Sequence, residues 1–233
     1  MELPRSEMLT LPGGLTRVEW RRNRRARRVS LRIDPCGGGV VVTLPMRAGR
    51  GAGVALLMNH AAWVADRIAA LPDAVPFSDG GLVSITGVPH RIRHVPDGQG
   101  GVWLQDGELH VSGELEFLRR RVQDYLRSEA LRRLSALVAV KSAMLDLKVR
   151  RISVKDTRSR WGSCAVDGSL AFSWRLIMTP EFVQDYVAGH EVAHLKYMNH
   201  GKRFWNLVDR LTPHAASAIP WLRAEGFRLL RVG

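Results

Sequence analysis

The run His190-Glu191-Val192-Ala193-His194 places two histidines four residues apart, with a glutamate between them. Four residues make roughly one helical turn, so both imidazoles would project from one face of a helix and could bind one zinc ion. Glu191 would lie beside that ion and could act as general base on a metal-bound water. The run therefore predicts a zinc-dependent hydrolase, and peptide hydrolysis is the favoured reaction.

The surrounding sequence favours a helix over residues 181–196. Val183, Tyr186 and Val187 recur at helical spacing on the same face as the two histidines. Thr179-Pro180 predicts the start of this helix, with Thr179 as N-cap and Pro180 at the first helical position. The histidines then lie on the buried face, where an imidazole needs a partner and a metal ion is a suitable one. The alternative is that they are ordinary hydrogen-bonded polar residues.

His200 is the candidate for a third metal ligand. At about 100° and 1.5 Å per residue, a straight helix would carry His200 away from His190 and His194. The helix must therefore end near residues 197–199, and Asn199 is suited to a left-handed position that would fold His200 back. The alternative is that His200 is a loop histidine with no role at the metal.

A second motif lies upstream of the histidines. Arg160-Trp161-Gly162-Ser163-Cys164 and residues 168–176 are separated by the turn signal Val166-Asp167-Gly168, which predicts a β-hairpin. The combination of R-W-G-S-C, this hairpin, T-P-E and H-E-V-A-H-L-K-Y-M-N-H-G-K-R-F-W closely resembles the YgjP-like metallopeptidase domain. That family is a small zincin, related in plan to the SprT-like and WLM proteases. The resemblance is strongest over residues 145–215 and extends loosely to the strands around 24–33.

The resemblance implies a gluzincin-like core, with zinc held by His190, His194 and His200 and with Glu191 as the base. It also implies that the strand carrying Trp161, Gly162 and Ser163 lies beside the metal. An extended peptide would pair with this edge strand through its backbone, and Gly162 would permit its close approach.

Three further residues near this strand have two interpretations each. Arg158 and Arg160 could face the cleft and contact substrate, with Arg160 the stronger candidate, or they could be solvated strand charges. Cys164 could approach the metal or could be a small buried residue, since two cysteines in the chain indicate neither a disulfide framework nor a cysteine zinc site.

The rest of the chain predicts an α+β fold. An antiparallel, strand-rich N-terminal part, residues 1–113, would contain strands within 15–34 and at 40–44, a helix at 53–70 and four short strands between 82 and 112. Residues 114–233 would contain a long helix at 116–143 and a zincin-like core with its motifs at 157–205. One continuous domain is the alternative, and residues 71–76 are the best candidate for a joint.

The chain is strongly basic, with 35 Lys and Arg against 22 Asp and Glu and a formal charge of +13. The cations cluster at 21–28, 119–121, 127–133 and 148–160. Such a balance favours DNA or another polyanion through counterion release, although a solvated basic surface is the alternative. Since the related SprT-like and WLM proteases act on DNA-bound proteins, a peptidase acting near nucleic acid is a hypothesis by analogy. Trp20 is the clearest aromatic among these clusters, and no stacking platform can be identified.

Two cysteines, the lack of a signal segment and the lack of a run of about 18 apolar residues predict a cytoplasmic protein without a membrane span.

A competing hypothesis to the peptidase is a basic nucleic-acid-binding or adaptor protein whose zinc is structural. Glu191 favours the enzyme, because a structural site needs no base between its ligands. A zinc nuclease is disfavoured, because the carboxylate clusters of two-metal phosphodiester chemistry are missing from the sequence.

Overall fold

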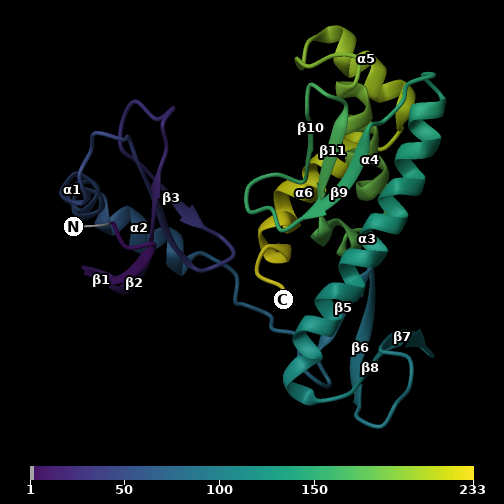
Figure 1. Cartoon of the computed structure of the whole chain (residues 1–233), viewed down its shortest axis with the longest axis horizontal. Helices are drawn as coiled ribbons and strands as arrows, with labels where there is room; N and C mark the ends of the chain where they lie inside the picture. Colours follow the sequence, from purple (N-terminus) through teal and green to yellow (C-terminus); the bar gives the residue numbers. More distant parts are fainter. Residues whose placement is uncertain (1–2) are drawn as a thin grey trace. The chain divides into compact units, whose positions relative to one another are not determined.

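A computed structural model describes residues 3–233 and divides the chain into two compact units, Met1–Asp73 and Ala74–Gly233 (Figure 1). The division lies inside the segment 71–76 and differs from a boundary between 113 and 114. The reason is packing, because the strands between residues 82 and 112 share one buried core with the helices of the second unit. Val83, Ile92 and Leu109 contribute to that core.

The N-terminal unit is a four-stranded sheet with two helices. Its strands are β1 (Ser6–Leu11), β2 (Gly14–Arg22), β3 (Ser30–Asp34) and β4 (Gly39–Leu44), in the order β1-β2-β4-β3. The sheet is mixed, because β2 and β4 run parallel while the other pairs are antiparallel. The single helix expected at 53–70 is instead α1 (Arg50–Asn59) and α2 (Ala61–Ala69), because His60 leaves the helical region with φ −116° and ψ 18°.

The C-terminal unit begins with a second mixed sheet and a long helix. The strands are β5 (Leu82–Ile85), β6 (Val88–Val95), β7 (Val102–Gln105) and β8 (Glu108–Ser112), in the order β5-β6-β8-β7. A 3₁₀ turn, Leu115–Phe117, leads into α3 (Leu118–Ala143). Helix α3 buries every fourth residue from Leu118 to Val138, which is the spacing of one helix face.

The rest of this unit is a three-stranded sheet and three helices. The strands are β9 (Arg151–Lys155), β10 (Gly162–Cys164) and β11 (Ser169–Ser173), in the order β10-β11-β9. A 3₁₀ helix, Trp174–Met178, precedes α4 (Glu181–His194), α5 (Lys202–Leu211) and α6 (Ala215–Leu229). The antiparallel pairing of β10 with β11 confirms the hairpin, and helix α4 packs against β10. The predicted α+β class is confirmed.

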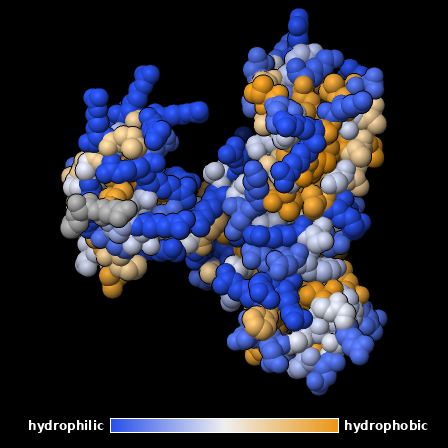
Figure 2. Space-filling model, viewed as in Figure 1, coloured by the Kyte–Doolittle hydropathy of each residue, from blue (hydrophilic) through white to orange (hydrophobic). Residues whose placement is uncertain are grey.

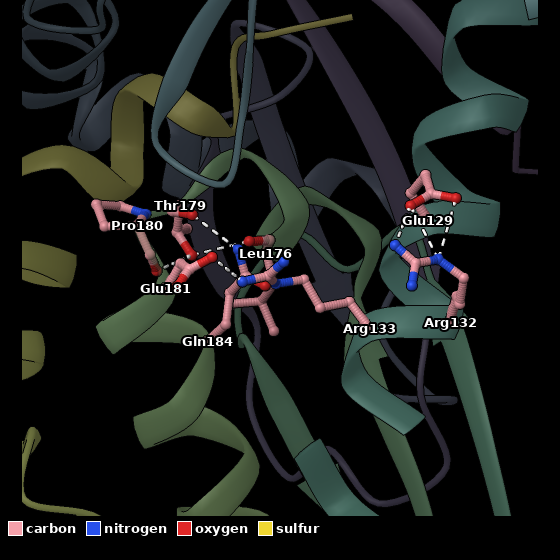
Figure 3. Close-up of polar contacts among 8 residues, drawn as sticks. All are labelled: Glu129, Arg132, Arg133, Leu176, Thr179, Pro180, Glu181 and Gln184. Carbon is pink, nitrogen blue, oxygen red and sulfur yellow. Dashed lines mark hydrogen bonds and ion pairs between the residues drawn. The ribbon is translucent and has the colours of Figure 1, made fainter. Parts of the chain in front are cut away.

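The start of α4 differs from the sequence expectation, because Pro180 is the N-cap and no side chain caps the helix. Thr179 instead donates its hydroxyl to the Leu176 carbonyl at 2.8 Å, and Gln184 Nε2 donates to the Thr179 carbonyl at 2.8 Å (Figure 3). Arg133 of α3 pairs with Glu181 in the first turn. These contacts fix α4 to α3 and to the preceding turn. None of the helices formed by residues 3–233 combines the length and apolar character needed to cross a bilayer.

A buried lysine joins α3 to α4 and to the end of α5. Lys141 is 4% exposed, and its Nζ lies 2.7 Å from Asp185 Oδ1 and 2.8 Å from the Leu211 carbonyl. Thr212 donates its hydroxyl to the other carboxylate oxygen of Asp185. Because each partner is satisfied by the others, the cost of burying the charges is offset.

Removing one member of this pair should be strongly destabilising. We expect Asp185→Ala to lower the free energy of unfolding by about 3–5 kcal/mol, because it leaves the Lys141 ammonium buried without its counter-charge. Urea unfolding of the second unit measures this loss. The double variant Lys141→Met with Asp185→Ala should recover part of it, and a loss below about 1 kcal/mol in the single variant would contradict the role assigned to the pair.

Candidate metal centre

The last turn of α4 determines where the second histidine points. The helix ends at His194, earlier than the expected end near residues 197–199. The Leu195 N–H donates to the Val192 carbonyl at 3.1 Å and the Lys196 N–H to the Ala193 carbonyl at 3.1 Å. These bonds span three residues rather than four and tighten the helix end.

The chain then reverses without a left-handed residue at Asn199, contrary to the sequence expectation. In residues 3–233, the non-glycine residues with positive φ are Thr86, Asp106 and Asp146. Asn199 Oδ1 instead accepts a hydrogen bond from the Gly201 N–H at 3.4 Å, and α5 begins at the next residue. An asparagine side chain closing a turn in this way is a common alternative to the left-handed backbone.

The reversal brings His190, His194 and His200 together. One ring nitrogen from each lies within 4.8 Å of the other two, and the Nε2 atoms of His190 and His200 are 3.2 Å apart. Two imidazoles on one tetrahedral zinc, each at about 2.0–2.1 Å, would have their nitrogens roughly 3.3 Å apart. The spacing in this protein fits a shared metal ion.

The outer nitrogens of two rings are already engaged. His194 Nδ1 donates to the Tyr197 carbonyl at 3.0 Å, and the Tyr186 hydroxyl lies 3.4 Å from His190 Nδ1. Such partners fix the orientation of a metal-binding histidine and leave Nε2 to coordinate. The sequence placed Tyr186 on the buried face of the helix but did not predict its contact with His190. It assigned no role to Tyr197. The position of Tyr197, three residues after His194, was the one sequence feature that could have indicated this contact.

The ring of Phe204 packs against all three imidazoles. Phe204 is fully buried, and its ring centroid lies 4.9 Å from that of His190, 4.5 Å from that of His194 and 4.7 Å from that of His200. Trp205 lies 5.9 Å from His190, centroid to centroid, and remains partly exposed. The sequence motif contains both aromatics but does not show that they contact the histidines.

The surroundings favour neutral imidazoles. Burial, together with the neighbouring His194 and His200, lowers the pKa of His190 to about 4. Burial also lowers the pKa of His194. Since the neutral ring is the form that binds a metal, the site is prepared for one at neutral pH.

Glu191 is buried beside the histidines with an exposed fraction of 5%. Burial raises the pKa of its carboxyl to about 7, opposed by the positive charge of Arg160. Its Oε2 atom has no hydrogen-bond partner among the described residues. A buried oxygen without a partner is costly, and it is the kind of group that a bound water or substrate would satisfy.

The backbone of β10 passes close to this carboxylate at Gly162. A Cβ placed on Gly162 would lie 2.4 Å from Glu191 Oε1, too close for any side chain. Trp161, Gly162, His190, Glu191 and Leu222 help to line a pocket of about 240 Å³. The sequence analysis expected a substrate peptide to approach Gly162 closely. In the structure, the group close to Gly162 is the Glu191 carboxylate of α4.

The other candidate residues lie elsewhere around β10. Ser163 and Arg160 line a separate hollow. Cys164 is not in the histidine cluster. Burial, together with the negative charges of Glu191 and Asp167, raises the pKa of its thiol to about 11.

Three histidines on a helix and its following turn form a group that could hold a metal ion, beside a buried glutamate and an edge strand. The chain belongs to the YgjP-like family, because the sequence model of the YgjP-like metallopeptidase domain matches residues 27–225 of the 233. No curated protein and no solved structure matches the chain. Family and site together support a peptidase with a metal at the histidine cluster.

Gly162→Ala should displace the Glu191 carboxylate, because the new methyl group would occupy the position of Oε1. We expect the free energy of unfolding to fall by about 1–3 kcal/mol and a crystal structure to show the Glu191 side chain in a new rotamer. Ser163→Ala is the matched control, since its side chain lies on the opposite face of the strand. An unmoved Glu191 in the Gly162→Ala protein would contradict the packing described above.

Proposed function

We propose that this protein is a zinc-dependent peptidase that uses Glu191 as general base. The observation that carries the proposal is the Glu191 Oε2 atom, buried without a partner in a pocket that His190 also lines. Keeping such a carboxylate unpaired costs stability, and a purely structural metal site has no use for it.

His190, His194 and His200 would hold the zinc. When bound, the ion supplies Lewis-acid chemistry, polarising the scissile carbonyl and lowering the pKa of water. Glu191 Oε2 would accept a proton from the attacking water, and the carboxylic acid so formed would donate it to the leaving amine nitrogen. Burial raises the pKa of this carboxyl, which favours uptake of the proton from water.

The cluster also argues against the adaptor with a structural zinc. Structural zinc sites are closed by four protein ligands, whereas the metal-ligating group found among residues 3–233 has three. Cys164, the residue that could have completed it, is not part of this group. A three-ligand site leaves a coordination position for chemistry.

A peptide substrate has a strand edge to bind. The Trp161 carbonyl accepts from the Ser173 N–H at 2.8 Å, and the Ala165 N–H donates to the Ser169 carbonyl at 2.9 Å. In an antiparallel ladder the residues between these pairs, Gly162 and Cys164, direct their N–H and C=O groups to the other side. Strand β10 is the outer strand of its sheet, so these groups can pair with an extended peptide.

We assign substrate contact to Trp161, Gly162, Ser163 and Arg160. The first two line the pocket beside Glu191. The last two line the hollow on the other side of the same strand. Both faces of β10 would therefore contact a bound chain.

Glu191→Gln should keep the zinc and lose hydrolysis, because glutamine preserves the shape of the side chain but cannot take the proton. We expect a fall of at least about 100-fold in kcat for cleavage of an unfolded protein, with about one zinc per chain by elemental analysis. His190→Ala should lose both zinc and activity. Wild-type protein purified without zinc, or full activity in Glu191→Gln, would contradict the mechanism.

A second proposal concerns the basic N-terminal unit, which we infer binds a polyanion such as DNA. The segment 21–28 carries six arginines, all exposed, and hydrophilic residues cover most of the visible face of this unit (Figure 2). Trp20, beside the segment, is buried at 4% exposure and bonds to Glu7, so it offers no base-stacking surface. The contacts would be to the phosphate backbone.

Replacing Arg24, Arg25, Arg27 and Arg28 by glutamine should weaken duplex DNA binding and its dependence on salt. Each lost phosphate contact reduces the slope of log K against log[salt] by about 0.9, so the slope should fall by up to about 3.6. Fluorescence anisotropy between low and moderate salt measures it. An unchanged slope in the variant would contradict the proposal that these arginines contact DNA. Wild-type binding that does not depend on salt would contradict it as well.

A further inference from the structure

The outer face of the small sheet, turned away from α4, carries a hollow of about 360 Å³ that we call the outer hollow. Its floor is a row of small side chains, Ser163 on β10, Ala171 on β11 and Ser153 on β9, which lie opposite one another in the pairing register. Successive side chains of a strand alternate between faces, so Ser163 lies opposite the face on which Gly162 contacts Glu191. Small residues in one row leave room for a ligand side chain.

The charged groups that line the outer hollow are all cations. Arg151 and Lys155 come from β9, and Arg160 precedes β10. None of the three forms an ion pair with an acid of the described chain. The acids nearest in sequence are engaged elsewhere, Asp156 with Arg175 and Asp167 with Arg150. Three unpaired cations around a hydroxyl-lined hollow attract an anionic group.

Strand β10 links this hollow to the proposed active site, because Gly162 lines the pocket beside Glu191 and Ser163 lines the outer hollow. A peptide pairing with the edge of β10 would present alternate side chains to these two faces. We propose that the outer hollow selects carboxylate side chains, aspartate or glutamate, on one alternate set of positions in the substrate. The inference rests on the proposed peptidase function and adds a substrate class to it.

A peptide carboxylate fits better than a nucleic-acid phosphate for two reasons. The described residues that line the hollow include no aromatic side chain on which a base could stack. The hollow also adjoins the strand edge whose free backbone groups suit a peptide. Strands are spaced about 4.8 Å apart, so Arg160 is within direct reach of a chain beside β10, while Arg151 and Lys155 on β9 act from about two spacings further away.

The test uses quenched fluorescent peptides in which a single glutamate is moved along an otherwise neutral sequence, each paired with its glutamine counterpart. We expect the glutamate peptides to be cleaved with a lower KM only at positions of one parity relative to the scissile bond. Arg160→Gln should raise KM for the glutamate peptides about fivefold more than KM for their glutamine counterparts, and the ratio of the two KM values is the readout. Arg151→Gln and Lys155→Gln should each change this ratio about twofold, since these residues are more distant.

Arg150→Gln is the matched control, because it removes the same charge from the residue beside β9 while Arg150 lies outside the hollow and pairs with Asp167. It should leave the preference for glutamate intact. Equal cleavage of glutamate and glutamine peptides would overturn the inference while leaving the peptidase function standing, as would a preference unaltered in Arg160→Gln.

A binding arm separates failure of the inference from failure of the proposed function. Zinc-loaded Glu191→Gln protein should bind the glutamate peptide about fivefold more tightly than the glutamine peptide by fluorescence anisotropy. That result would support the inference even if the wild-type protein cleaved neither peptide. Displacement of the peptide by a short oligonucleotide, lost in Arg160→Gln, would reassign the hollow to phosphate groups and overturn the carboxylate assignment.

Discussion

The contact between the Gly162 backbone and the buried carboxylate of Glu191 is the constraint on which the site depends. The carboxylate is confined by the strand on one side and belongs to the same helix as two of the histidines. Any shift of β10 relative to α4 would therefore change the position of the proposed base relative to the proposed substrate edge. Because the two elements pack against each other at this contact, a peptide bound along β10 would lie beside Glu191.

Helix α4 can hold this position because contacts in its first two turns fix it to its neighbours. Arg133 pairs with Glu181, and Gln184 donates to the Thr179 carbonyl. Asp185 shares the buried Lys141 with the end of α5. These interactions lie outside the metal cluster, so the alignment of His190 and His194 does not depend on a bound ion alone. A site preorganised in this way loses less entropy when metal and substrate bind.

Sequence periodicity predicted the elements that carry a repeating apolar face and missed the features made by single contacts. The hairpin, α3 and α4 follow from alternation and helical spacing, because those periods reflect burial on one side. The end of α4 was predicted too late, because the bonds from Leu195 and Lys196 that tighten it leave no trace in composition. The sequence also could not predict that Pro180 is the N-cap or that the Asn199 side chain closes the turn. In both places the residue types allow more than one local geometry. The packing of Phe204 against three imidazoles could not be predicted, because nothing in a sequence distinguishes such an aromatic from an ordinary core residue.

Strand β10 is only three residues long, yet its alternation separates two chemical environments. Gly162 faces the buried carboxylate of Glu191, and Ser163 faces the cations of the outer hollow. Arg160 acts on both sides of the strand, since its charge lowers the pKa of Glu191 against the opposing effect of burial while its side chain lines the outer hollow. A substitution at Arg160 would therefore affect the proposed general base and the proposed selection of carboxylates together. For that reason the ratio of glutamate to glutamine cleavage, rather than either rate alone, reports on the hollow.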